Sequence, residues 1–193
     1  MFDFFIGILF FVSSFSFSEF IEIKSCDNDD SFSIVCGFQN PEDLYLSPSK
    51  NKIIISEFGS LAPNTKYGNI SYYDLVSESK KNPIFLYAEN TWGDPKCKLK
   101  SRQLSPHGID LIQRDDDRYM LAVVNHLPQE SIELFELVED DSIELIWRGC
   151  IDAPENKYFN DVALKTNGSF YITHMYDFDS SQWAIAFASM IKN

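Results

Sequence analysis

Short apolar runs separated by polar turns fill the chain after residue 30. The runs Lys52–Ser56, Tyr119–Val124 and Ser169–Thr173 are rich in β-branched and aromatic residues, which predicts strands. The first two are apolar at nearly every position and are therefore expected to be interior strands. Ile132–Leu137 alternates apolar and charged residues, which predicts a strand with one face in water. No amphipathic helix longer than three turns is evident after residue 18, so the pattern predicts an all-β fold.

Turn-forming residues separate these runs. Ser47–Asn51, Arg114–Asp117 and Thr166–Gly168 combine Pro, Gly, Asn, Asp and Ser, the residues that reverse a chain between strands. Each of these turns is expected to join two antiparallel strands.

A three-fold repeat accompanies the turns. Each unit opens on a special or polar pair, continues as a short strand, makes a tight turn and ends in a β-branched strand. The units begin at Pro41, Pro106 and Phe159. Repeat units whose starting points are this far apart, with several strands in each unit, are typical of β-propeller blades. The sequence therefore predicts a β-propeller with about three blades in this chain.

The first strands of propeller blades line a central channel, so residues that open them converge on one axis. The converging pairs are Glu42 and Asp43, His107 and Gly108, and Asn160 and Asp161. Like charges so close together need a cation, and Ca²⁺ accepts this mixture of carboxylate, amide and carbonyl oxygens. The alternative is that these residues are solvated, open their strands and bind no ion.

Two histidines belong to the second unit. His107 opens its inner strand and His126 ends the next one, so antiparallel pairing is expected to bring the two imidazoles together. An imidazole beside a Lewis-acidic ion is able to activate water, which points to ester or lactone hydrolysis. His174, at the end of a strand, is expected to be structural.

Composition narrows the function classes. The net charge of −13 excludes a nucleic-acid or anionic-membrane footprint, because both need clustered positive charge. Hydrophobic residues make up 45% of the chain, with 17 Phe, which is enough for a packed core. One folded domain is expected.

The N-terminal segment predicts export. Phe4–Val12 is an unbroken apolar run, shorter than a membrane-spanning helix, and Ser16 and Ser18 offer a cleavage site before Glu19. Residues 1–18 are thus a signal peptide or, if retained, a hydrophobic anchor for a lipid or membrane surface, and 19–193 form the domain.

Two further features suit an exported protein. Cys26, Cys36, Cys97 and Cys150 have no zinc-type spacing and allow three disulfide pairings. The sequons that begin at Asn69 and Asn167 are glycosylation candidates.

Five segments, in order and spacing, resemble the paraoxonase/arylesterase family of six-bladed calcium propellers. They are Pro-Glu-Asp at 41–43, Ser-Pro-His-Gly-Ile at 105–109, Val-Val-Asn-His at 123–126, Ile-Glu-Leu-Phe-Glu at 132–136 and Asn-Asp-Val at 160–162. The resemblance implies that Glu42 and Asn160 bind a catalytic calcium.

It also implies roles for five other residues. Asp43, Asp161 and the carbonyl of Ile109 would bind a structural calcium, and His107 with His126 would form a proton-shuttling dyad. The implied substrates are small lactones and aryl esters, and the implied location is extracellular.

The resemblance covers about residues 36–175, the first half of such a propeller. The expectation is therefore a truncated or fragmentary copy, with self-association to close the ring as one alternative and a different, inactive fold as another. The competing function is a non-catalytic propeller-type binding protein with only a structural calcium; a sugar-lactone hydrolase is a nearer variant.

Overall fold

The computed structural model describes residues 26, 32–60 and 65–181, and within these it is all-β, with no helix. The predicted signal or anchor segment, residues 1–18, lies outside the described residues, and the described part has no helix able to span a membrane. The chain divides into two units, Met1–Cys36 and Gly37–Asn193, and the strands found in the described residues lie in the second. The strands are β1 (Pro41–Leu46), β2 (Lys52–Glu57), β3 (Asn69–Asp74), β4 (Ser79–Lys81), β5 (Ile84–Tyr87), β6 (Pro106–Gln113), β7 (Tyr119–Asn125), β8 (Ser131–Glu139), β9 (Ile143–Asp152), β10 (Lys157–Leu164) and β11 (Phe170–Asp177).

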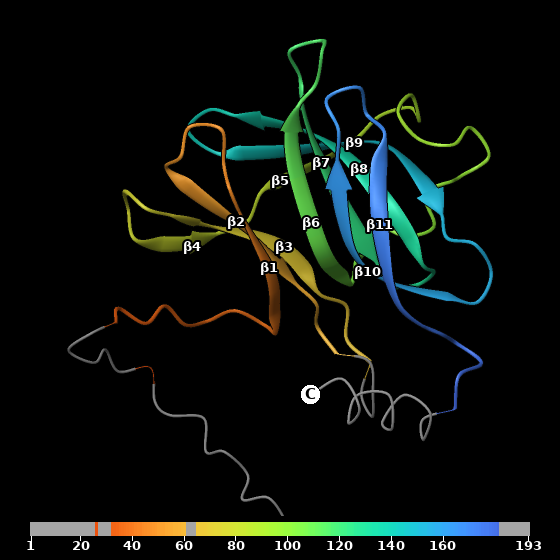
Figure 1. Cartoon of the computed structure of the whole chain (residues 1–193). Coiled ribbons are helices and arrows are strands. Elements are labelled where there is room, and N and C mark those ends of the chain that lie inside the picture. Colours follow the sequence, from red (N-terminus) through yellow and green to blue (C-terminus); the bar gives the residue numbers. More distant parts are fainter. Residues whose placement is uncertain (1–25, 27–31, 61–64, 182–193) are drawn as a thin grey trace, which may run out of the picture. The chain divides into compact units, whose positions relative to one another are not determined.

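The strands form three sheets, one for each predicted repeat unit (Figure 1). The first has the order β1-β2-β3-β4, the second β5-β9-β8-β7-β6, and the third pairs β10 with β11. The opening strands β1, β6 and β10 contact one another in that order. This is a propeller-type arrangement of sheets, and the described residues do not close it into a ring.

Residues 120–124 of strand β7 are all apolar because both faces of the strand are buried. Leu121 and Val123 join one core, which the second sheet shares with Ile54 and Ile70 of the first. Met120, Ala122 and Val124 join another core, with residues of β10 and β11. Since side chains alternate across a strand, a strand between two cores needs apolar residues at every position. The predictions of interior strands for β2 and β7 are confirmed by their central places in the sheets.

The prediction of a wet face on residues 132–137 of β8 is wrong. Glu133 is only 3% exposed, and it accepts hydrogen bonds from Trp147 Nε1 and Ser131 Oγ, both at 2.7 Å. Burial raises the pKa of the Glu133 carboxyl, as does the nearby charge of Asp152, while the two hydrogen bonds lower it in part. The second sheet lies between two cores, so the charged side chains of β8 have partners within the protein instead of water.

The three predicted turns are confirmed. Lys50, Asp117 and Gly168 adopt positive φ values of 62°, 64° and 82°. These left-handed positions close the β1–β2, β6–β7 and β10–β11 connections.

A carboxylate of the second sheet ties it to the first. Glu139, at the end of β8, accepts hydrogen bonds from Ser47 Oγ at 2.9 Å, Ser49 N at 2.9 Å and Lys52 Nζ at 3.0 Å. Its side chain is 7% exposed, although the acidic run Glu139–Asp141 predicts an exposed turn. Burial works against ionisation, but the bonds from Ser49, Lys52 and Ser47 outweigh it and lower the pKa of Glu139.

Glu139→Gln is expected to lower the free energy of unfolding by about 2 kcal/mol at pH 7, because it leaves buried Lys52 without its counter-charge. A lowered folded pKa gives stability that is present above the unfolded value and lost as pH falls through the folded value. The deficit should therefore shrink in acid. Urea titrations at pH 7 and in acid measure the loss of stability, with the exposed variant Glu155→Gln as the control. Equal stability of the two variants at pH 7 would contradict this role.

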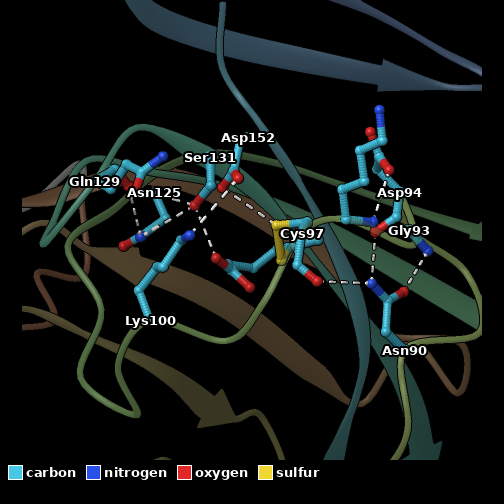
Figure 2. The surroundings of a disulfide bond; sticks show 12 residues. Asn90, Gly93, Asp94, Cys97, Lys100, Asn125, Gln129, Ser131 and Asp152 are labelled. Atoms are coloured by element: carbon cyan, nitrogen blue, oxygen red, sulfur yellow. Dashed lines mark hydrogen bonds and ion pairs between the residues drawn. A yellow bond between two sulfur atoms is a disulfide. The ribbon is translucent and has the colours of Figure 1, made fainter.

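Two disulfides settle the pairing that the sequence leaves open. Cys26 pairs with Cys36 in the first unit, and Cys97 pairs with Cys150 in the second. Figure 2 shows the second bond, which joins the loop between β5 and β6 to β9. Asn90 organises this loop, because its Nδ2 donates to Asp94 O and Cys97 O while its Oδ1 accepts from Gly93 N.

Candidate functional site

The structure brings together the residues that open β1, β6 and β10. Ile109 N donates to Asp43 Oδ2 at 2.9 Å, which links β6 to β1. On the other side, Gly108 packs on β10 so closely that a Cβ there would lie 2.6 Å from Asp161 Cα and 2.7 Å from Asn160 O. The residue pairs that open the three repeat units therefore meet. The absence of a side chain at Gly108 permits the close approach of β10.

His107 lies at the centre of this meeting. Its Nδ1 donates to Asn160 O at 2.8 Å, because a carbonyl oxygen only accepts. Its Nε2 lies 3.5 Å from Glu42 Oε2, an ion pair only when the ring is protonated. The His107 side chain is 20% exposed, so the imidazole is partly open to solvent.

His126 lies beside His107 but is buried, with 1% of its side chain exposed. The ring centroids of the two histidines are 5.3 Å apart, at 74°. Nδ1 of His126 lies 2.5 Å from Glu130 Oε1, and its Nε2 has no hydrogen-bond partner among the described residues. The expected proximity of the two imidazoles is observed.

Aromatic and acidic neighbours of His126 escape sequence reasoning. Tyr158 stacks on the ring at 4.2 Å between centroids, and Phe58 meets it edge-on at 5.4 Å. Burial raises the pKa of Tyr158, and the charges of Tyr176, Glu130 and Glu42 raise it further. Phe58 and Tyr158 are far from His126 along the chain, so the sequence does not reveal their contacts with it. Glu130 is only four residues away, so its contact with His126 could have been suspected from the sequence.

The candidate calcium ligands form two groups rather than one cluster. Asp43 and Ile109 are joined by a hydrogen bond, and Glu42 and Asn160 both contact His107. Among the described residues, the carboxylates of Glu42, Asp43 and Asp161 are not gathered within 4.8 Å of one another. Asp161 is exposed.

These residues fit calcium by their chemistry. They are hard oxygen donors: three carboxylates, the Asn160 amide and the Ile109 carbonyl. A carboxylate oxygen that accepts one backbone bond keeps a lone pair for a cation. The arrangement is thus compatible with an ion.

Another close group of ligand-type side chains contains Cys97, Cys150 and Asp152. An Asp152 oxygen lies 3.2 Å from Cys97 Sγ, but both sulfurs are joined in the disulfide and offer no thiolate. This group is therefore structural. His174, 49% exposed and 3.6 Å from Asp177, lies on the surface.

Comparison with known families gives one result that spans this site. The family model described as arylesterase matches residues 39–191, which include every candidate residue above. A search of curated proteins found no match.

Proposed function

Because the chain belongs to the arylesterase family, we propose that it is a secreted, calcium-dependent hydrolase of small lactones and aryl esters. The observation that carries the proposal is the pair of imidazoles, 5.3 Å apart, beside Glu42 and Asn160. The His107 imidazole is partly exposed, and the His126 imidazole is buried, with no partner for its Nε2 among the residues the structure describes; this suits proton transfer at a small-molecule site.

Glu42 and Asn160 are the residues we propose for a catalytic calcium, and Asp43, Asp161 and the Ile109 carbonyl for a structural one. A bound calcium would polarise the carbonyl oxygen of the substrate. The chemistry of these donors supports the assignment, since carboxylate, amide and backbone carbonyl oxygens are the ligands that calcium takes.

The chain's own residues would move the protons. An imidazole Nε2 of the His107–His126 pair takes a proton from water, and the water oxygen bonds to the ester carbonyl carbon. The bond from that carbon to the leaving-group oxygen then breaks, and the imidazolium returns its proton to that oxygen. Asn160 O holds His107 in the tautomer that leaves Nε2 free for this step.

The test is hydrolysis of phenyl acetate and a panel of lactones by the full chain, in calcium and in chelator, with thermal melting of the same samples. Turnover that is lost in chelator, in Glu42→Gln and in His107→Gln would support the proposal. The surface variant His174→Gln is the matched control and should retain activity. A fold that calcium stabilises without turnover would favour the non-catalytic binding protein instead.

Secretion makes a separate prediction about the two sequons. Asn167 and Ser169 are exposed in the β10–β11 turn, whereas Ser71 is fully buried in β3 and Asn69 Nδ2 is bonded to Asn82. A glycan in β3 would disturb its pairing, so we expect a single glycan, at Asn167, when a eukaryotic secretory host makes the chain. Intact mass before and after glycosidase measures it: Asn167→Gln should abolish the shift and Asn69→Gln should not.

A further inference from the structure

Glu130 lies in the short connection between β7 and β8 and is held rigidly beside His126. It is 8% exposed, its Oε2 accepts from Phe159 N of β10 at 3.2 Å, and its backbone carbonyl accepts from Ala153 N at 3.0 Å. These two bonds leave Oε1 facing His126 Nδ1 at 2.5 Å. The carboxylate therefore cannot turn away without breaking a bond to another strand.

The His126 ring is also fixed on its faces. Tyr158 lies parallel to it at an interplanar angle of 8°, and Tyr176 stacks on Tyr158 in turn, with centroids 4.9 Å apart. Phe58 and His107 meet the ring at steep angles, 70° and 74°. A ring held by a stack and two edges has one orientation, so Nδ1 stays on Glu130 and Nε2 points away from it.

The unusual feature is His126 Nε2, for which the described part of the chain offers no hydrogen-bond partner. Buried polar atoms in folded proteins nearly always have a hydrogen-bond partner, and those without one need an explanation. An ionised carboxylate only accepts, so Glu130 requires a hydrogen on Nδ1, and in the neutral ring Nε2 then has a bare lone pair. Neutral His126 is thus a buried proton acceptor next to His107.

We propose that Glu130 is a positioning residue, which holds His126 in the Nδ1–H tautomer so that its Nε2 serves as a proton acceptor beside His107. The inference rests on the proposed hydrolysis for its functional part. Its structural part, the tautomer and its cause, stands on the contacts of Glu130 and Tyr158.

Glu130→Gln provides the sharpest test. A glutamine of the same shape keeps a carbonyl oxygen for Phe159 N and then presents an amide N–H to His126 Nδ1, which forces the hydrogen onto Nε2. Glu133→Gln is the matched control, because Glu133 is equally buried but its oxygens face Ser131 and Trp147. Both variants preserve side-chain volume, and thermal melting verifies that they fold.

The first readout is the ¹⁵N spectrum of the imidazoles of the full chain, at a pH where they are neutral. The chain has three histidines, and the His126 signals are those lost in His126→Gln. We expect the Nδ1–H tautomer in the wild type and in Glu133→Gln, and the Nε2–H tautomer in Glu130→Gln. An Nε2–H wild type, or a Glu130→Gln variant with an unchanged tautomer, would overturn the proposal.

The second readout separates this inference from the proposed function. If the wild type hydrolyses esters, Glu130→Gln and His126→Gln should each lower kcat about 100-fold or more with KM nearly unchanged. Retained kcat in Glu130→Gln beside a loss in His126→Gln would refute the positioning role. If the wild type hydrolyses nothing, the proposed function fails, and the tautomer spectra alone decide whether Glu130 controls His126.

Discussion

Removing the disulfide of the second unit, as Cys97→Ala/Cys150→Ala, is expected to lower the free energy of unfolding by about 4 kcal/mol. The bond closes a loop with a sequence separation of 53 residues, and chain entropy in the unfolded state scales with the logarithm of that length. Both sulfurs also pack in the core that the first two sheets share, where Cys97 is 2% and Cys150 0% exposed. Their loss leaves unfilled space as well as a longer free loop.

The bond has local consequences beyond loop closure. Thr91 N and Trp92 N donate to Arg148 O, and Asp94 N donates to Cys150 O, so the loop after β5 continues the pairing along β9. Without the disulfide, the pairing of this loop with β9 is expected to open before the rest of the sheet. Hydrogen exchange of these amides should rise sharply in the double variant, while exchange in β7 should follow global unfolding only.

Urea denaturation of the wild type and the double variant measures the loss. The control is Cys26→Ala/Cys36→Ala, which removes a bond of the first unit with a separation of 10 residues and should leave the unfolding of the sheets unchanged. A double variant of the second unit that unfolds at the wild-type urea concentration would show that the loop is held by its backbone bonds alone.

Gly108→Ala is expected to lower the free energy of unfolding by about 3 kcal/mol and, if the chain is a hydrolase, to reduce its activity about 100-fold. The obstructing atoms, Asp161 Cα and Asn160 O, belong to the backbone of β10 and cannot rotate away. To accommodate a methyl group, β10 must move from β6. That movement would carry Asn160 O away from His107 Nδ1, so the cost falls on the site as well as on stability.

Gly37→Ala is the matched control for this effect. Gly37 has φ +93°, and no atom of the described residues lies within 4 Å of its missing Cβ, so alanine there is expected to cost only backbone strain, about 1 kcal/mol. Gly108 shows the reverse case, in which crowding alone opposes the side chain. Urea titrations and the ester assay compare the variants, and a Gly108→Ala protein as stable as the wild type would contradict the close approach of β10.

Local chemistry carried most of the fold prediction. Turn residues such as Asp117 and Gly168 reverse the chain where their backbone preferences predict, because left-handed conformations depend on the residue itself. The repeat predicted that the residues opening β1, β6 and β10 would meet, since side-chain alternation and strand pairing are periodic. Glu42, His107 and Asn160 could therefore be selected as one candidate site before their contacts were known, although their calcium and catalytic roles stay predictions.

Long-range contacts decided what the sequence alone left open or predicted wrongly. Glu133 reads as a solvent-facing residue by its alternation, but whether a face is wet depends on the sheet packed against it, and Trp147 lies there instead of water. The disulfide pairing and the contact of Glu130 with His126 likewise depend on which strands pack together. Sequence determined the strands, the turns and the candidate chemistry, because these follow from neighbouring residues. Tertiary structure decided burial, pairing and the orientation of His126, because these follow from residues that only folding brings together.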